Sequence, residues 1–355
     1  MNSRFRSFIS LNLEYFYKKI LLSVLILLFF ATGCTSAAKD PGENSSIYLT
    51  AMDTVMKLTA YGPHRQEALE QAQEEIERLD AALSIGNPDS EISKLNASGS
   101  AVLSPDTAAL LGRAMELNRD TEGLFDVTVY PLVKLWGFFD KNYHVPTEEE
   151  RLDAMARMGS DRLTFTPETG AVTLDAGQSI DLGAIGKGYA SQRAARLMKE
   201  AGVSSALLSL GGNVQCLGSK PDGSPWNIGI RDPWSESGGL YCTVRVRDKA
   251  VITSGGYERY FVMDGKTYLH ILDPRTGCPA ESGLSSVSII TDDGTLGDGL
   301  STALYIMGLE KAGDYWRSHK DSFEAVLIAD DGSLYATPGL KGSISSQHPI
   351  EYLEP

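Results

Sequence analysis

The clearest hydrophobic period along the chain covers Arg65 to Leu83, where apolar residues recur every three or four positions between glutamates and glutamines. This spacing places the apolar side chains on one face of a helix. A second helix is predicted from Ser104 to about Arg119, because serine is a favoured N-cap and Pro105 suits the first turn. Further helical patterns cover residues 183–202, 297–308 and 310–319.

Most other segments alternate between apolar and polar residues, as half-buried strands do. Strands following one another directly, with several helices between them, predict an α+β fold in which mixed or antiparallel sheets are layered with helices. The predicted strands lie at residues 47–61, 172–182, 205–210, 226–231, 241–246, 250–253, 259–263, 287–291, 325–329 and 333–336.

The N-terminus has the pattern of a secretory signal, with Lys18 and Lys19 before an apolar run at 20–30 that is too short to span a bilayer. Small residues then lead to Cys34, which resembles the lipid acceptor of bacterial lipoproteins. An ordinary signal peptide ending near a cysteine is the alternative. We therefore predict a lipoprotein signal peptide at 1–33, a flexible tether at 34–46 and one folded domain at 47–355.

The chain has a formal net charge of −14, and removal of residues 1–33 makes the charge more negative. So acidic a chain argues against nucleic acid as the main partner, because phosphate backbones bind lysine and arginine surfaces. Any anionic ligand would need a bound cation or a helix N-terminus. Apart from Cys34, the cysteines have neither metal-site nor disulfide-framework spacing: Cys216, Cys242 and Cys278.

The stretch DLGAIGKGYA at 181–190 has the glycines and lysine of a phosphate-binding loop. It is not a P-loop, because only two residues separate its first two glycines and Gly188 stands where serine or threonine is required. One interpretation is a glycine-rich start of a helix without a ligand. The other is a ligand site, because Asp181 and Lys187 flank a helix N-terminus and the carbonyl of Ala184 is a hard oxygen donor.

Asp298 and Thr302 lie four residues apart near a helix start and therefore share one helix face. A carboxylate and a hydroxyl in this relation suit Mg²⁺, although such a pair taken alone is more often an N-cap arrangement than a metal site. His270 lies on a predicted strand that leads through Asp273 into a turn, and a histidine on an apolar strand is more often structural.

Paired glycines end two of the predicted strands, at 211–212 and at 255–256. Glycines there permit close approach of the backbone to a ligand, but they also suit tight turns. Taken singly, none of these signals identifies a function.

Nine segments stand in a characteristic order along the chain, at 52–54, 83–96, 123–138, 181–190, 209–213, 226–233, 252–261, 270–277 and 298–308. Together they resemble the ApbE-type flavin transferases, the FAD:protein FMN transferases, over about residues 47–340. Many members of that family are lipoproteins that act outside the cytoplasm, which agrees with the pattern around Cys34.

The resemblance implies two sets of site residues. Contacts with FAD are implied for Met52, Leu124, Phe125, Asp126, Asp181, Lys187 and the backbone of Leu272. Binding of Mg²⁺ is implied for the carbonyl of Ala184 and the side chains of Asp298 and Thr302. Two positions depart from the family pattern: Gly86 stands where many members have an aromatic residue that stacks on the flavin, and Ser301 where some have aspartate.

The activity that the resemblance implies is Mg²⁺-dependent cleavage of FAD at its pyrophosphate, transfer of FMN to a threonine or serine hydroxyl of an acceptor flavoprotein, and release of AMP. Asp298 and His270 are the expected catalytic residues, with His270 as general base and Asp273 or Asp298 as alternatives for that role. Two other functions stay open: an FAD pyrophosphatase that uses water as acceptor, and a non-catalytic FAD-binding lipoprotein. The expected location is the extracytoplasmic side of a membrane, held there by the lipid anchor.

Overall fold

The computed structural model describes residues 42–355 except residue 236. The predicted signal peptide, Cys34 and most of the predicted tether lie outside the described residues. Within residues 42–355, no helix is long and apolar enough to cross a membrane. The predicted end of the tether at 46 needs correction, because strand β1 (Asn44–Ala51) already pairs with β2 (Thr54–Tyr61) from its first residue.

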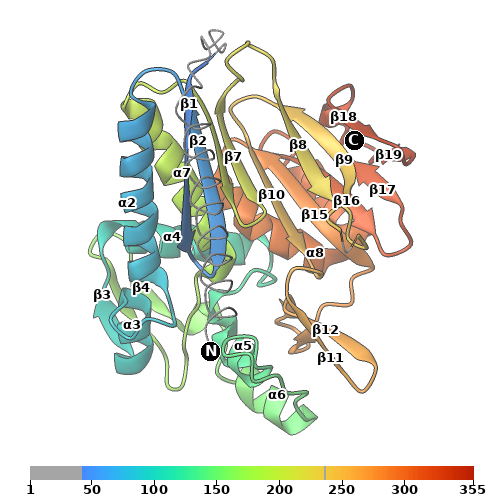
Figure 1. Cartoon of the computed structure of the whole chain (residues 1–355). Coiled ribbons are helices and arrows are strands. Elements are labelled where there is room, and N and C mark those ends of the chain that lie inside the picture. The colour runs from blue at the N-terminus through green and yellow to red at the C-terminus, as the bar shows by residue number, and fades with distance from the viewer. Residues whose placement is uncertain (1–41, 236) are drawn as a thin grey trace, which may run out of the picture. The chain divides into compact units, whose positions relative to one another are not determined.

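The helices are few and of very different lengths (Figure 1). They are α2 (Arg65–Leu83), α3 (Glu91–Ser98), α4 (Pro105–Asp120), α5 (Tyr130–Leu135), α6 (Glu148–Met155), α7 (Gly183–Glu200) and α8 (Gly294–Ser318), with 3-10 turns η1 (Val127–Val129), η2 (Ser160–Arg162) and η3 (Pro338–Leu340).

A nine-stranded sheet forms the centre of the fold, in the order β1-β2-β6-β7-β10-β15-β16-β17-β19. Its pairs are antiparallel except for β17 with β19. After β1 and β2, its strands are β6 (Ser205–Leu210), β7 (Asn213–Gly218), β10 (Ala250–Gly255), β15 (Leu284–Thr291), β16 (Glu324–Ala329), β17 (Leu334–Ala336) and β19 (Ile350–Tyr352).

Four smaller sheets complete the fold. Their strands are β3 (Ser100–Val102), β5 (Ala171–Thr173) and β4 (Thr164–Thr166); β18 (Ile344–Ser346), β9 (Leu240–Val246) and β8 (Trp226–Arg231); β11 (Tyr260–Met263) and β12 (Lys266–Leu269); and β13 (Leu272–Asp273) and β14 (Cys278–Pro279). The predicted α+β class, with sheets layered against helices, is confirmed.

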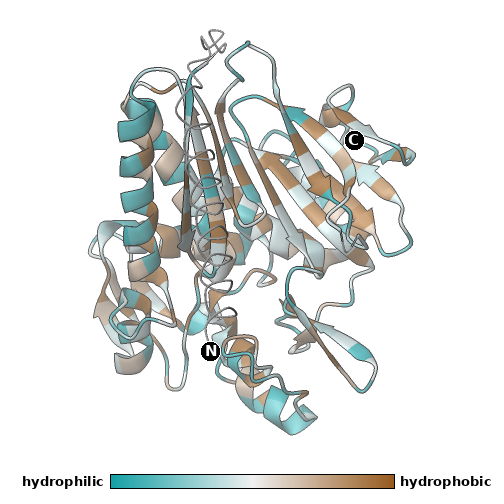
Figure 2. Cartoon of the chain, in the orientation of Figure 1, coloured by the Kyte–Doolittle hydropathy of each residue, from teal (hydrophilic) through white to brown (hydrophobic). Residues whose placement is uncertain are grey.

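Both faces of the central sheet are packed against other elements, except where β1 and β2 expose Tyr48 and Val55. Helices α2, α7 and α8 pack on one face, where Met56, Leu58 and Leu208 are fully buried. The sheet of β18, β9 and β8 covers the other face and encloses the buried thiols of Cys216 and Cys242. Figure 2 shows the hydrophobic residues gathered on the central strands and hydrophilic bands along α2, as the sequence period of that helix predicts.

The prediction was accurate for the long helices and for strands such as β6 and β8, and it missed the short helices. Helix α2 has the predicted bounds, and α8 joins the two predicted C-terminal helices across a kink at Gly308. The strands predicted at 172–182 are wrong beyond residue 173, because residues 174–182 form turns that lead into α7. Helices α3, α5 and α6 were not predicted.

Candidate active site

Helices α7 and α8 touch at a point where α7 has no room for a side chain. A Cβ added to Gly188 would lie 2.2 Å from the backbone oxygen of Gly294 and 2.6 Å from Cβ of Asp298. Glycine at position 188 therefore permits the two helices to cross in backbone contact. This crossing brings the first turn of α7, with Ala184 and Lys187, beside the second turn of α8.

Asp298 lies at this crossing with only 5 % of its surface exposed. Its Oδ2 accepts a hydrogen bond of 2.7 Å from the N–H of Gly188, and its Oδ1 accepts one of 2.9 Å from Nδ2 of Asn213. The N-cap of α8 is Asp293, whose carboxylate accepts from the N–H of Leu296. The alternative that Asp298 serves as an N-cap is therefore wrong.

The other two predicted metal ligands lie close to Asp298. In an α-helix the N–H of residue 188 points at the carbonyl of residue 184, so the Ala184 carbonyl and the Asp298 carboxylate both face the amide of Gly188. Thr302 lies one turn after Asp298 on α8, and its Oγ1 is 3.2 Å from Oγ of Ser254 on β10. The structure thus brings a peptide oxygen, a carboxylate and a hydroxyl together.

The chemistry of this group suits a hard divalent cation. Within residues 42–355, no lysine, arginine or histidine nitrogen pairs with the buried Asp298 carboxylate within 4.0 Å. A buried carboxylate without a cationic partner is unfavourable, and its remaining lone pairs are available to a metal. No group of three or more His, Cys, Asp or Glu side chains in that range has metal-site geometry, so the donors here are mixed oxygens.

Ser301, where some family members have aspartate, does not leave a gap. Its side chain is fully buried, and its Oγ lies 2.8 Å from Oγ of Ser254 and 2.9 Å from the carbonyl of Asp298. The hydroxyls of Ser254, Ser301 and Thr302 therefore form one connected group. An aspartate at position 301 would add a negative charge next to Asp298, and serine adds none.

Asp181 and Lys187 flank the N-terminus of α7, as predicted. The N–H of Asp181 donates to the carbonyl of Val127, and its Oδ1 accepts from the N–H of Gly183. Burial raises the pKa of the Asp181 carboxyl, while the positive charges of Lys187 and Arg259 act in the opposite direction. Both cations therefore lie close enough to Asp181 for their charges to act on its carboxyl group.

Arg259 is a site residue that the sequence analysis missed. Its guanidinium lies 4.0 Å from the carboxylate of Asp53, in the β1–β2 turn where Met52 and Asp53 both have positive φ. Its charge also acts on His270 and Asp181. Nothing in the local sequence distinguishes Arg259 from other surface arginines.

The predicted FAD contacts at 124–126 divide into two kinds. Leu124 and Phe125 are buried, and Phe125 packs against the glycine that follows Asp298. The Oδ1 atom of Asp126 instead accepts hydrogen bonds from the N–H and hydroxyl of Thr128 and from Ser160. The Oδ1 atom of Asp126 therefore stabilises the loop.

His270 follows β12, and its Nδ1 lies 3.0 Å from the carbonyl oxygen of Arg259. A carbonyl only accepts, so Nδ1 carries the proton and Nε2 is left with its lone pair. Burial lowers the pKa of His270 to about 4, and the charges of Arg259 and Lys187 add to that effect. The imidazole is therefore neutral at pH 7 and able to accept a proton at Nε2.

Asp273 is not free to act as the alternative base. Both of its oxygens accept from the guanidinium of Arg275, and Oδ1 also accepts from the N–H of Arg275. These bonds hold the turn after β13. Leu272 is buried beside Trp136, with its backbone in the short β13–β14 pair.

Position 86 has an aromatic ring beside it, although the residue is glycine. A Cβ added to Gly86 would lie 4.0 Å from Cε2 of Phe139, which is 39 % exposed. Phe139 also packs edge-on against Tyr130, with ring centroids 5.7 Å apart. An aromatic surface is thus present near the position where the family pattern expects one.

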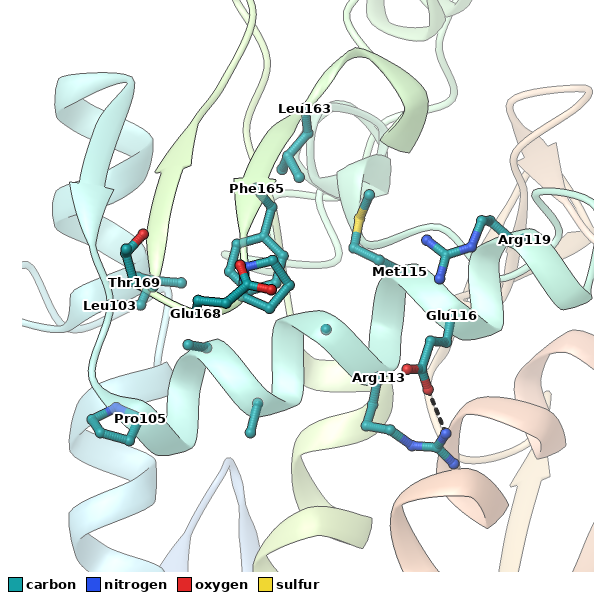
Figure 3. A pocket seen from close by; sticks show the side chains of 15 residues that line it. Leu103, Pro105, Arg113, Met115, Glu116, Arg119, Leu163, Phe165, Glu168 and Thr169 are labelled. Atoms are coloured by element: carbon teal, nitrogen blue, oxygen red, sulfur yellow. Dashed lines mark hydrogen bonds and ion pairs between the residues drawn. The ribbon is translucent and has the colours of Figure 1, made fainter.

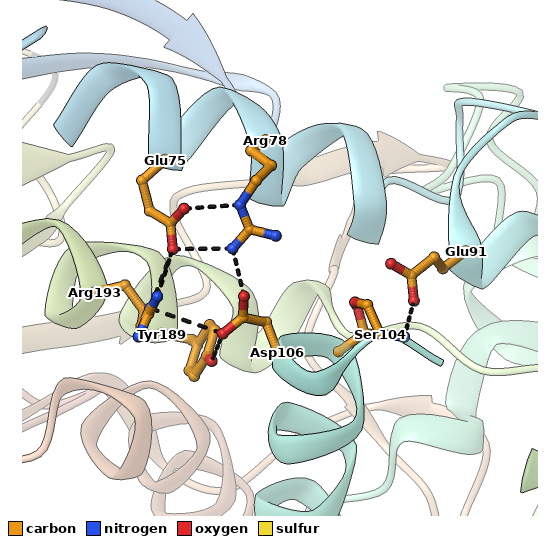
Figure 4. Close-up of polar contacts among 8 residues, drawn as sticks. Glu75, Arg78, Glu91, Ser104, Asp106, Tyr189 and Arg193 are labelled. Atoms are coloured by element: carbon orange, nitrogen blue, oxygen red, sulfur yellow. Dashed lines mark hydrogen bonds and ion pairs between the residues drawn. The ribbon is translucent and has the colours of Figure 1, made fainter. Parts of the chain in front are cut away.

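A surface groove and an ion-pair network lie outside this group of residues. Figure 3 shows a groove between α4 and the β4–β5 turn, lined by residues such as Met115, Phe165 and Arg119, which contains none of the predicted site residues. Figure 4 shows an ion-pair network in which Glu75 of α2 and Asp106 of α4 bind Arg78 and Arg193. Since Arg193 belongs to α7, the network fixes the site helix to its neighbours.

The fold and the site together describe an α+β protein suited to a phosphate-bearing ligand, with a helix N-terminus, buried oxygen donors and two cations around it. The chain belongs to the ApbE family, whose sequence model matches residues 52–327.

Relatives and solved structures agree with this membership. The chain is 31 % identical over 341 residues to the FAD:protein FMN transferase of Treponema pallidum, covering 90 % of this chain and 93 % of that protein. It is 32 % identical over 281 residues to the Escherichia coli K12 protein of the same name, covering 76 % and 79 %. The ApbE protein of Thermotoga maritima superposes with a TM-score of 0.80 at 30 % identity, covering 85 % of this chain and 99 % of that one. The flavin transferase ApbE of Vibrio cholerae gives 0.75 at 29 % identity, with the same coverage of both chains.

Proposed function

We propose that this chain is an FAD:protein FMN transferase that uses Mg²⁺ to transfer FMN from FAD to a threonine or serine hydroxyl of an acceptor flavoprotein, with release of AMP. The observation that carries the proposal is the convergence of the Ala184 carbonyl, Asp298 and Thr302 at the crossing of α7 and α8. The names of the relatives supply the substrate and the reaction.

The residues of the site have distinct tasks in this reaction. Asp298, Thr302 and the Ala184 carbonyl would hold Mg²⁺, which when bound neutralises pyrophosphate oxygens and stabilises the leaving AMP. Asn213 and the N–H of Gly188 fix the Asp298 carboxylate, so its orientation is set before any ligand binds. Lys187 and Arg259 add positive charge on the side where the FAD phosphates would lie.

We infer that His270 is the general base. Its neutral Nε2 accepts the proton of the acceptor hydroxyl while its Nδ1–H donates to the Arg259 carbonyl. Asp273 is paired with Arg275, and Asp298 is the proposed metal ligand, oriented by hydrogen bonds from Gly188 and Asn213. We infer that the exposed ring of Phe139 provides the stacking surface that Gly86 lacks.

One experiment separates the three candidate functions. The full-length protein in detergent is incubated with FAD, Mg²⁺ and peptides that contain threonine, and AMP, FMN and peptide-bound flavin are measured. Covalent flavin fluorescence on a peptide after denaturing electrophoresis, with AMP release, is the expected result. Free FMN with no labelled peptide would identify a pyrophosphatase, and intact FAD that remains bound would identify a storage protein.

We further propose that Cys34 is acylated after removal of residues 1–33 and that the enzyme works on the extracytoplasmic side of a membrane. The support is the sequence pattern around Cys34 alone. Metabolic labelling with a fatty acid, compared between the natural chain and a Cys34→Ala variant, tests this. Label that persists in the variant would contradict the proposal.

A further inference from the structure

The hairpin of β11 and β12 stands apart from the other sheets. Among residues 42–355 its two strands pair only with each other, so the outer edge of each strand carries unpaired backbone N–H and C=O groups. Figure 1 shows the hairpin projecting from the end of the central sheet near α5. Free edges of this kind are places where another chain can add a strand.

The two faces of the hairpin differ sharply. On the inner face Phe261 is 6 % exposed and stacks on Tyr143 and Tyr268, with ring centroids 4.7 and 5.1 Å apart. On the outer face Tyr260 is 51 % exposed and Val262 is 60 % exposed. The inner contacts hold the hairpin rigid, while two large apolar side chains remain in water on its outer face. Grouped exposed apolar residues commonly mark an interaction surface.

The outer face continues into the candidate active site. Arg259 precedes β11 and His270 follows β12, and both the N–H and Nδ1 of His270 bond to the carbonyl of Arg259 at the base of the hairpin. The side chain of Leu269 packs on Gly256, where an added Cβ would lie 2.6 Å from Cδ1. Two residues earlier, Ser254 contacts Thr302. A chain lying on this face is thereby led toward both the proposed base and the proposed metal ligands.

The charge of the hairpin indicates what kind of segment it accepts. Residues 260–269 contain one acidic and one basic residue, Asp264 and Lys266, in a chain of net charge −14. Lys266 is already paired with Glu281 at 3.1 Å. The surface is therefore neutral and apolar, which suits an uncharged extended segment better than a basic or acidic one.

We propose that the β11–β12 hairpin docks the acceptor flavoprotein, which adds an uncharged extended segment to the hairpin and thereby brings its threonine or serine hydroxyl to His270. This inference rests on the proposed transferase function. It specifies that the acceptor is recognised through backbone pairing and apolar contact with Tyr260 and Val262.

The test uses an array of synthetic peptides of about 15 residues with a central threonine and varied flanks, long enough to pair with a strand of typical length. The full-length protein in detergent, FAD and Mg²⁺ are added, and peptide-bound flavin is measured. Tyr260→Thr with Val262→Thr removes the apolar groups and keeps residues that favour strands. Tyr48→Thr with Val102→Thr is the matched control, since those side chains are 66 % and 74 % exposed on β1 and β3.

We expect the hairpin variant to label the best wild-type peptide about tenfold more slowly at low peptide concentration, through a higher KM with little change in kcat. Release of AMP from FAD without peptide should match the wild type in both variants. Equal labelling by the hairpin and control variants would overturn the proposal. A wild-type enzyme that releases AMP yet labels no peptide would also overturn the proposal. The same holds if the hairpin variant changes only the oligomeric state, from dimer to monomer, and leaves labelling unchanged. Absence of both FAD cleavage and labelling in the wild type would instead overturn the proposed function.

Discussion

The backbone N–H of Gly188 donates a hydrogen bond of 2.7 Å to Oδ2 of Asp298, across the crossing of α7 and α8. This bond links the glycine-rich start of one helix to the carboxylate on the next. It depends on the absence of a side chain at position 188, because any Cβ there would overlap the backbone oxygen of Gly294. The geometry of the candidate metal site is therefore set by a helix packing contact.

A Gly188→Ala substitution should destabilise the protein by about 2 kcal/mol, because overpacking at a backbone contact forces the helices apart. The same displacement should remove nearly all transferase activity. Gly112→Ala on α4 is the control, because its added Cβ would lie 3.7 Å from Phe165, an ordinary contact distance, and should stabilise the helix slightly. Urea denaturation and AMP release measure both effects. A Gly188→Ala enzyme as stable and active as the wild type would exclude the tight crossing.

Asp298→Asn should reduce AMP release by about 100-fold or more, because it removes the only carboxylate from the proposed metal ligands while keeping the side-chain shape. The Mg²⁺ concentration needed for half-maximal activity should rise. Asp293→Asn is the control on the same helix: asparagine is also a favoured N-cap, so activity should be retained. Mg²⁺ titrations of AMP release by the wild type, Asp298→Asn and Asp293→Asn test this prediction, with thermal unfolding as a check on the fold. An unchanged Mg²⁺ dependence in Asp298→Asn would remove this residue from the metal site.

The acidic limb of transferase activity should lie well below pH 6.5. Because the folded pKa of His270 is lowered to about 4, the imidazole stays neutral as pH falls from 8 to 5 and its base function is lost only near pH 4. His270→Asn should lower transfer by about 100-fold or more without weakening FAD binding. His144→Asn is the control, since His144 is an exposed partner of Glu150. A limb centred near 6.5 in the pH dependence of kcat/KM would show an unperturbed histidine.

Glu75 should make folding stability sensitive to acid. The hydrogen bond from Arg78 lowers the pKa of Glu75 although burial raises it. Burial also raises the pKa of Asp106, but hydrogen bonds from Tyr189 and Arg78 outweigh that effect and lower it. A carboxyl group whose pKa is lower in the folded than in the unfolded state stabilises the protein at pH values above its unfolded pKa, which is near 4. This stabilisation is lost as the pH falls through the folded pKa.

Glu75→Gln should therefore reduce the free energy of unfolding by about 2 kcal/mol at pH 7, and the difference from wild type should shrink as pH falls below 4. Glu77→Gln on the same helix, whose partner is the exposed Gln73, should change stability by less than about 0.5 kcal/mol. Urea unfolding at several pH values gives the comparison. A Glu75→Gln loss that is the same at every pH would mean that packing, not charge, accounts for it.

The sequence predicted what repeats along a single element and missed what depends on contacts between elements. Helix α2 was predicted to its last residue because its apolar period is long, whereas the eight-residue α3 has too few turns for a clear period. The proximity of Asp298 to Ala184 followed from the family resemblance. Its cause is the contact of α7 with α8 at Gly188, which joins segments more than 100 residues apart and cannot be read from either segment alone. Arg259 was missed because its role depends on Asp53 across the fold.

Strand β1 begins at Asn44, and under the proposed acylation of Cys34 this start limits the distance between the folded domain and the membrane. Nine residues lie between Cys34 and Asn44. A fully extended chain gains at most about 3.5 Å per residue, so the ten steps from Cys34 to Asn44 span at most about 35 Å. Such a molecule would stay close to the lipid surface. With that anchor, we expect acceptors that offer their hydroxyl near the lipid surface to be modified and those held farther away to escape modification.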